Sequence, residues 1–544
     1  MKPPELVSAT PEEIDELLAL AKATFPAKSY QLLEGVLGTF VYVMGALQNA
    51  KTSLKRFRQM LFGARTESKS NLFKTPGVAR AADEAALAGT PPPTPGERSE
   101  NPPAPPVTPG HGRNGAQAYS NSPVVEIAPP GFKSGDPCPQ CAEGKVYDAP
   151  PKVIVKVVGS PPLTATVFKL GQLRCRLCDA TFTGVLPEGA SAPKYDSSCA
   201  SMLALLRYGS GMPFYRLEGL QASLNVPLPD ATQWEIVSKA RPAPQAVFNE
   251  LIVQAAQAEV LHSDDTPAKI LSLMAERTQT EQAGQTPKNK AINTSGIVAL
   301  LGQEHKVVLF FTGHKHAGNN LADVLAHRAK ELQTPIQMSD ALASNFVGEF
   351  KTLVAKCILH GRRKVVDVME HFPQECRHVI EVLAQVYANE AHCRDEKLSP
   401  EPRLLYHQAQ SAPLLHDLHR WINEQFDQRR VEPNSGLGQA LRYFLKHWSG
   451  LTLFLHQAGA PLDNNIVERS LKRAIRHRNN SLFYKTPNGA QTGDIYMSLI
   501  HTCALGQVNP FEYLQALQLH VEEVQATPAL WLPWNYREQL KPTG

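Results

Sequence analysis

The sequence predicts a multidomain α/β protein, and three observations support this fold class. The chain has 544 residues, enough for roughly three to five domains. In residues 257–360, apolar runs follow one another in the order strand, hairpin, helix, strand, and the first and last strands end at aspartates. Residues 361–458 have helical periodicity instead. This order is of the ribonuclease-H type, so we expect a ribonuclease-H-like core that contains an all-helical insertion.

Composition and charge narrow the class of protein. The formal net charge is only +4, so contacts with nucleic acid must be sought in local basic patches. Nine cysteines are too few for a disulfide scaffold. The longest nearly apolar run, residues 36–47, is far shorter than the ~20 residues that span a bilayer, and no signal-peptide pattern opens the sequence. We therefore expect a soluble cytoplasmic protein with no membrane partner.

Residues 1–75 are predicted to be a helical oligomerisation segment with a basic end. Large apolar residues recur every seven positions, as in a coiled coil, at Leu33, Phe40, Leu47, Leu54 and Leu61. An amphipathic helix packed on its own domain explains this spacing equally well. Residues 51–74 carry seven Lys or Arg and one acid, which fits either a DNA-phosphate contact or a solvated charge run. Residues 76–123 are rich in proline and predict a disordered linker.

Two Cys-x-x-Cys pairs predict a zinc ribbon over residues 124–190. The four cysteines are Cys138, Cys141, Cys175 and Cys178. Four thiolates are a common ligand set for tetrahedral zinc, and predicted strands at residues 152–158 and 164–174 would hold the two pairs together. A redox pair or unliganded buried thiols are the alternatives. Structural Zn²⁺ in such a closed site stabilises a module and performs no chemistry.

Residues 191–256 have a helical pattern that includes a candidate helix-turn-helix. Residues 213–224 and 232–239 are periodic, and a turn rich in proline separates them. A helix pair of this kind can read a DNA groove. It is more often a packing unit, so both interpretations stay open.

A basic helix is predicted in residues 459–505, with Asp463 as its N-cap. Four cations fall on one helical stripe, at Arg469, Lys472, Arg473 and Arg476. Glu468 lies at the edge of this stripe. A solvated helix in which Glu468 pairs with Lys472 is one interpretation. A nuclease also needs such a surface, because cations hold phosphates while the acid binds a metal ion.

Several segments resemble the signatures of a known family. They are His262-Ser-Asp-Asp-Thr266, Cys357-Ile-Leu-His-Gly-Arg-Arg-Lys364, Asp463-Asn-Asn-Ile-Val-Glu-Arg469 and Arg478-Asn-Asn-Ser-Leu-Phe483. In this respect the chain resembles the insertion sequence 66 family of transposases, which are DDE enzymes with a ribonuclease-H-like core. The resemblance implies Asp264, Asp340 and Glu468 as the catalytic triad. Asp265 is a rival for the first position, but neighbouring strand residues face opposite ways, so only one of the two points into the site.

The resemblance also implies an activity, cofactors and partners. We expect metal-dependent cleavage at transposon ends and strand transfer into target DNA, with Mg²⁺ or Mn²⁺ held by Asp264, Asp340 and Glu468. Candidate DNA-binding residues are His360, Arg362, Arg363, Arg469, Lys472, Arg473 and Arg476. A homo-oligomer and accessory proteins of the same element are expected partners. The alternatives are a non-catalytic zinc-ribbon DNA-binding regulator derived from a transposase, and a nuclease that cleaves without joining. Residues 506–544 are predicted to be a C-terminal helical cap.

Overall fold

The computed structural model describes most of the chain from residue 194 onward and parts of the chain before it. The described residues are 11–26, 29–31, 33–35, scattered positions between 124 and 187, 194–286, 291–302, 304–341, 347–348 and 350–541. Internal contacts divide the chain into two units, residues 1–154 and 155–544. None of the helices in the described ranges combines the length and the apolarity that a membrane span requires.

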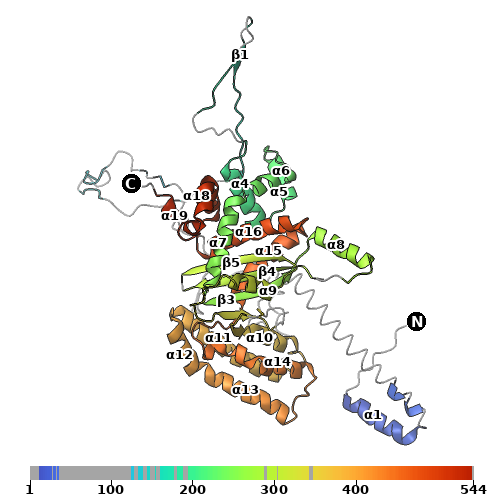
Figure 1. The fold of residues 1–544 in the computed structure, drawn as a ribbon. Helices are drawn as coiled ribbons and strands as arrows, with labels where there is room; N and C mark the ends of the chain where they lie inside the picture. The colour runs from blue at the N-terminus through green and yellow to red at the C-terminus, as the bar shows by residue number, and fades with distance from the viewer. Residues whose placement is uncertain are drawn as a thin grey trace, which may run out of the picture. The chain divides into compact units, whose positions relative to one another are not determined.

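The first unit begins with helix α1 (Pro11–Thr24), drawn in blue in Figure 1. Further helical residues follow at 29–31 and 33–35. These helical residues lie within the segment 1–75 that the sequence predicts to be helical. The later seven-residue positions, from Phe40 to Leu61, and the linker at 76–123 lie outside the described residues.

The predicted zinc ribbon is described only in part. In the first unit, the backbone N–H of Cys138 donates to the Gly144 carbonyl at 2.8 Å, and Pro137 forms an antiparallel bridge with Lys145. The first cysteine of the first pair therefore lies next to a short antiparallel bridge. Cys141, Cys175 and Cys178 lie outside the described residues, so the four-thiolate site stays a prediction.

In the second unit, β1 (Gln172–Arg174) pairs antiparallel with β2 (Thr181–Thr183). The predicted strand over residues 164–174 is wrong for residues 164–171, which have no regular secondary structure. The physical reason is that a strand needs a hydrogen-bonding partner, and the pairing with β2 begins only at Gln172. In the sequence, β1 precedes the second Cys-x-x-Cys pair and β2 follows it. The hairpin therefore does not lie between the two pairs, where the strands were predicted.

The second unit is built on a five-stranded mixed sheet with the order β5-β4-β3-β6-β7. Strands β3, β4 and β5 are antiparallel, whereas β6 and β7 run parallel to β3. The predicted mixed α/β class is thus confirmed. The bounds are β3 Val260–Pro267, β4 Asn293–Leu301, β5 His305–Gly313, β6 Ile336–Ser339 and β7 Leu353–Lys356.

Helices cover both faces of this sheet. Helix α9 (Ala317–Leu325) lies on one face, where it also contacts α7 (Pro242–Ala256). Helix α15 (Asn465–Ser481) packs on β3 and β4 from the opposite face. Helix α8 (Leu271–Gln282), which the sequence pattern did not predict, has no buried residue and extends away from the sheet (Figure 1).

Helix α16 (Pro487–Leu505) protects the outer edge of β5. Along one side of α16, Asp494, Ser498 and Thr502 follow one another at intervals of four residues and accept hydrogen bonds from the backbone. The donors are the N–H groups of Thr312, Phe310 and Val308, at 2.6, 2.9 and 3.0 Å respectively. An uncovered strand edge invites pairing with other chains. The helix supplies the acceptors that a sixth strand would otherwise provide.

Helices also precede the sheet and follow α16. Upstream of α7 are α4 (Ser197–Ala204), the π-helix η2 (Leu205–Gly209), α5 (Phe214–Ser223) and α6 (Asp230–Lys239). The two candidate helix-turn-helix segments are therefore helical, and their role in DNA binding stays a prediction. Downstream of α16 are α17 (Pro510–Leu519), α18 (Val521–Ala526), η5 (Pro528–Trp531) and α19 (Tyr536–Gln539), as expected for a helical cap.

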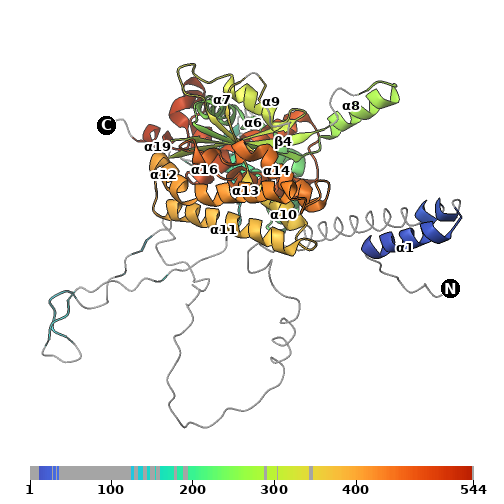
Figure 2. The ribbon, with the colours of Figure 1, turned by 90° about the horizontal axis from the view of Figure 1, so that it is seen from below.

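The long interval between β7 and α15 is helical, as predicted. Its elements are α10 (Ile358–Asp367), α11 (Pro373–Asp395), α12 (Pro400–Gln410), α13 (Ala412–Asp427), α14 (Gly436–Leu451) and η4 (Leu453–Leu455). Figure 2 shows α10 to α14 gathered together on one side of the second unit. The helical part begins at Ile358 and not at residue 361, because β7 ends at Lys356 and Cys357 is already the N-cap of α10.

Candidate active site

Two of the predicted acids lie on neighbouring parallel strands. His262 of β3 pairs with Met338 of β6, and two residues further along each strand are Asp264 and Asp340. Residues i and i+2 of a strand face the same side. The register therefore brings the two aspartates next to each other where β6 ends at Ser339.

The third acid, Glu468, lies in the first turn of α15. Close packing of this helix depends on Gly296, which stands opposite Asp264 in the ladder. A Cβ atom on Gly296 would lie 2.9 Å from Leu471 Cδ2 and 3.2 Å from Val467 Cγ2. The missing side chain therefore lets α15 lie directly on the strand pair that carries Asp264.

Asn464 fixes the start of α15 against the strand. Its fully buried side chain donates from Nδ2 to the Ser263 carbonyl at 3.0 Å. Its Oδ1 lies 3.0 Å from His262 Nδ1, and burial lowers the pKa of His262 to about 4. The imidazole is therefore neutral, and we assign its Nδ1–H as the donor to Asn464.

The helix begins one residue later than predicted. Asn464, and not Asp463, is the N-cap. The Asp463 carboxylate still accepts from the backbone N–H of Asn465 at 3.0 Å and from its side-chain amide at 2.9 Å. The difference arises because the Asn464 side chain is used for the tertiary contact with β3, while Asp463 shapes the turn before the helix.

The electrostatics of Asp264 indicate that the three acids are close together. Burial raises the pKa of Asp264 to about 7. A hydrogen bond from the Asp265 backbone N–H, at 2.8 Å, opposes this shift. The negative charges of Asp340 and Glu468 raise the pKa further. In addition, Glu468 Oε1 is buried without a hydrogen-bond partner, which does not fit a solvated Glu468–Lys472 pair.

Asp265 faces the other side of the sheet. Its Oδ1 accepts from the Ser295 hydroxyl at 2.6 Å, and its Oδ2 accepts from the Ala317 backbone N–H at 3.0 Å. His316 Nδ1 lies 3.1 Å from the same oxygen. These bonds tie β3 to β4 and to the start of α9, so the structure gives Asp265 a role in packing.

His360 and the cations near it come from the start of the helical insertion. His360 lies in the first turn of α10. Burial lowers its pKa, the charge of Glu468 opposes this, and the positive charge of Arg363 lowers the pKa again. His360, Glu468 and Cys357 each place one potential ligand atom within 4.8 Å of the others.

The predicted cationic stripe of α15 is present. Arg469, Lys472 and Arg476 are exposed, whereas Arg473 is half-buried. Burial and the neighbouring charge of Arg476 lower the pKa of Arg473. The neighbouring positive charges of Arg473 and Arg476 suit an anion of extended shape, such as a phosphate backbone.

Comparison with known proteins identifies the family. Residues 194–492 match the family model described as Transposase IS66 family. The chain belongs to the IS66 family of transposases. The matched range includes the whole sheet, the helical insertion and α15.

Three curated relatives, all from Sinorhizobium fredii, are similar to this IS66-family chain. The uncharacterized protein y4jD is 31% identical over 216 residues, which are 39% of this chain and 38% of the relative. The uncharacterized protein y4hP is 30% identical over 26% of this chain and 25% of the relative. The uncharacterized protein y4qI is 26% identical over 34% of each chain. The chain thus spans less than two-fifths of the length of the curated relatives it matches.

The IS66-family chain has a second cationic group that the sequence pattern did not reveal. Lys356 Nζ lies 2.7 Å from His447 Nδ1, and Lys364 Nζ lies 5.1 Å from the ring centre of Tyr443. Burial lowers the pKa of Lys356, the charge of Lys446 lowers it further, and Asp340 opposes this. We call Lys356, Lys364, Lys446 and His447 the insertion cluster. It brings β7, α10 and α14 together beside Asp340, and no local motif could have joined residues so far apart in the sequence.

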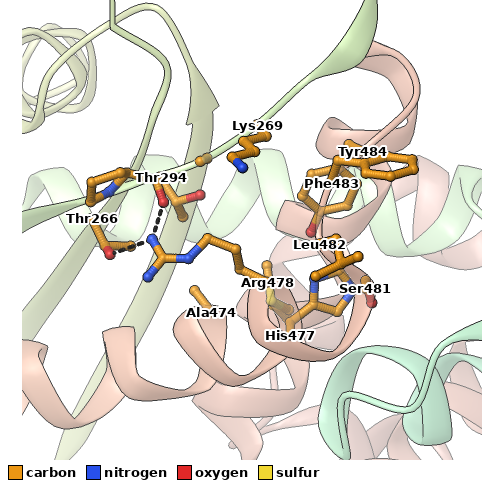
Figure 3. A pocket seen from close by; sticks show the side chains of 13 residues that line it. Thr266, Lys269, Thr294, Ala474, His477, Arg478, Ser481, Leu482, Phe483 and Tyr484 are labelled. Carbon is orange, nitrogen blue, oxygen red and sulfur yellow. Dashed lines mark hydrogen bonds between the residues drawn. The ribbon is translucent and has the colours of Figure 1, made fainter. Parts of the chain in front are cut away.

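The last family signature, residues 478–483, connects the end of α15 to the end of β3 (Figure 3). Arg478 Nη1 donates to Thr266 Oγ1 at 3.0 Å and to the Pro267 carbonyl. After α15, the backbone N–H of Tyr484 donates to the Lys269 carbonyl at 2.9 Å. A small cavity lies between these segments. The signature therefore attaches the far end of α15 to the strand that carries Asp264.

Proposed function

We propose that the chain is a DDE-type DNA transposase whose catalytic acids are Asp264, Asp340 and Glu468. The observation that carries this proposal is the register of β3 and β6, which brings Asp264 beside Asp340, together with the packing of the first turns of α15 on the strand pair that carries Asp264. Three carboxylates from β3, β6 and α15 lie close enough to repel one another, in a chain of the IS66 family. Such acids need counter-cations in order to stay ionised together.

The strand order supports a ribonuclease-H-like core for this enzyme. The first three strands form an antiparallel meander, and the last two are added in parallel beside the first. This is the order expected from the sequence. In this order, Asp264 lies on the central strand and Asp340 directly follows its parallel neighbour.

The residues present fit divalent metal ions. Carboxylate oxygens are the ligands that Mg²⁺ and Mn²⁺ prefer, and Glu468 Oε1 is a buried acceptor without a partner. Two bound ions would activate a water or a 3′-hydroxyl and stabilise the leaving oxygen of an in-line displacement at phosphorus. Asp264, Asp340 and Glu468 are the residues that would hold these ions. Asn464 and Gly296 hold Glu468 at the strand by the contacts described above.

We further propose that DNA lies between the cations of α15 and those of the helical insertion. Arg469, Lys472 and Arg476 expose positive charge on α15, next to the helix turn that carries Glu468. On the other side, the insertion cluster lies beside Asp340. His360, Arg362 and Arg363 at the start of α10 would contact phosphates near the cleaved bond. Phosphate contacts of this kind set the position of the DNA and not its sequence specificity.

The zinc ribbon, the oligomeric state and the partners are part of the same proposal. Structural Zn²⁺ would be held by Cys138, Cys141, Cys175 and Cys178. Oligomerisation would use the N-terminal helical segment, and accessory proteins of the same element would join the complex with transposon ends and target DNA. Their support is the sequence pattern described at the outset.

A cleavage and joining assay tests the proposed activity. The protein is incubated with Mg²⁺ and DNA that carries candidate inverted repeats, and wild type is compared with Glu468→Ala. The matched control is Glu522→Ala, which removes an exposed acid on α18. We expect joined products with wild type and the control, and none with Glu468→Ala. Binding without cutting would favour the regulator, and cutting without joining would favour a nuclease. Full activity of Glu468→Ala would remove this residue from the site.

A further inference from the structure

Three side chains of different chemistry converge at the point where the helical insertion leaves and rejoins the core. Cys357 is the N-cap of α10, His360 lies in the first turn of α10, and Glu468 lies in the first turn of α15. One ligand atom from each lies within 4.8 Å of the other two. The two helices thus start beside each other and direct these side chains to one place.

Backbone contacts hold this arrangement. The N–H of Ile358 donates to the Leu462 carbonyl at 3.2 Å. The N–H of Asn464 donates to Cys357 Sγ at 3.3 Å, a bond that also suits a thiolate. Because both helix starts are tied together, the three side chains do not depend on a flexible loop for their position.

Two polar atoms at this point lack partners. His360 Nδ1 and Glu468 Oε1 are both buried without a hydrogen bond. Burying a polar atom without a partner is unfavourable. The nitrogen of His360, the oxygen of Glu468 and the sulfur of Cys357 are therefore three electron-pair donors gathered at one place, which is the kind of ligand set that binds a metal ion.

We propose that Cys357, His360 and Glu468 bind a transition-metal ion of the Zn²⁺ type. Thiolate and imidazole are ligands for Zn²⁺ and Co²⁺, whereas Mg²⁺ prefers oxygen. Bonds of roughly 2.0–2.3 Å to tetrahedral zinc place the ligand atoms about 3.5 Å apart, so the side chains need only a small approach. Three protein ligands leave the fourth position to water.

Binding exchanges a proton for the metal ion. A cysteine thiol carries its proton at neutral pH when no metal is bound. The S–H bond breaks, the S–metal bond forms, and the proton passes to solvent. His360 uses a lone pair of its neutral ring, and no oxidation or reduction takes place.

The site has a regulatory consequence, which rests on the proposed function. Glu468 belongs both to this group and to the proposed Mg²⁺-binding triad. An ion held by Cys357 and His360 takes a Glu468 oxygen from that triad, so Zn²⁺ should inhibit DNA cleavage even when Mg²⁺ is in large excess.

Metal stoichiometry tests the site without DNA. The full-length protein is equilibrated with Zn²⁺ or Co²⁺, and the bound metal is counted in wild type, Cys357→Ser and His360→Gln. The control is Cys376→Ser, which removes another buried thiol of the insertion. Wild type and control should bind one ion per chain more than either site variant. For Co²⁺, the site variants should also lose part of the thiolate-to-cobalt absorption. Thermal melting of each variant shows whether it is folded. If Cys357→Ser does not fold, the comparison between wild type and His360→Gln tests the site.

Equal metal binding by wild type and both folded site variants would overturn the proposal. The inhibition is measured separately, as cleavage with and without Zn²⁺, each variant relative to its own zinc-free activity. The ratio of cleavage with Zn²⁺ to cleavage without Zn²⁺ should be at least about tenfold lower for wild type than for Cys357→Ser. An effect of this size is usual for weakened metal ligation. A protein without any cleavage activity can still show the extra ion, so failure of the proposed function and failure of the metal site are distinct outcomes.

Discussion

At the scale of single residues, Asn464 shows how one buried amide can hold an active-site helix. It bonds to Ser263 and His262 of β3, while its backbone bonds to Cys357. Replacing Asn464 by Ala leaves a buried carbonyl and a buried imidazole N–H without partners. We expect this variant to lose about 2–4 kcal/mol in the free energy of unfolding, measured with urea. The control Asn465→Ala, which loses only its side-chain bond to Asp463 and keeps the backbone one, should lose less than half as much. Equal losses would contradict this role of Asn464.

The raised pKa of Asp264 predicts that the stability of the protein depends on pH. The folded pKa of Asp264, about 7, is above the value of about 3.9 in an unfolded chain. A raised pKa of an acid favours the folded state at low pH, and this stability is lost as pH rises through about 7. Melting temperature should therefore fall between pH 5 and pH 8 in the absence of divalent ions. Mg²⁺ should raise it more at pH 8 than at pH 5.

Asp494 titrates in the same range, because burial raises its pKa to about 7 as well. The contribution of Asp264 is thus the difference between wild type and Asp264→Asn. If this variant keeps the whole pH dependence and the whole response to Mg²⁺, Asp264 is not the group responsible.

At the scale of secondary structure, the packing of α15 on the sheet depends on the absence of a side chain at Gly296. The variant Gly296→Ala should push Leu471 outward and destabilise the protein by about 1–3 kcal/mol. The double variant Gly296→Ala, Leu471→Ala should be more stable than the sum of the single changes predicts, because the smaller side chain leaves room for the new methyl group. Strict additivity of the unfolding free energies would show that the two residues do not compete for space.

The α16 edge makes a second prediction at this scale. Ser498→Ala leaves the Phe310 N–H buried and unpaired, at a cost of about 1–3 kcal/mol. Hydrogen exchange at the Phe310 amide should become faster, while exchange in β6 should change only as far as global stability does. Unchanged exchange at Phe310 would mean that another group accepts its hydrogen bond.

These elements also show what the sequence could and could not predict. Apolar runs before Asp264 and Asp340 predicted the strands, and the helical spacing after Asn464 predicted α15, because both signals are local. The contact between Gly296 and Leu471, the ladder on α16 and the insertion cluster join residues distant in sequence, so no periodicity reports them. The N-cap assignment failed for a related reason, since Asn464 is engaged by β3 and leaves the turn to Asp463.

At the scale of the whole molecule, the proposed DNA path would be shared between the core and the helical insertion. If Lys446 contacts a phosphate, Lys446→Ala should weaken binding to all DNA sequences alike and reduce the slope of log affinity against log salt by about 1. Lys330→Ala removes an exposed cation after α9 and is the matched control. An unchanged salt slope in Lys446→Ala would place the DNA away from the insertion.

One hydrogen bond, from Ile358 to Leu462, joins the first residue of α10 to the segment before α15. The two ends of the insertion therefore lie one peptide group apart, whatever length of polypeptide runs between the two residues. A shorter or longer helical block that begins and finishes one peptide group apart could be grafted here, and chimaeras made at this junction would separate the chemistry of the core from the reach of the block.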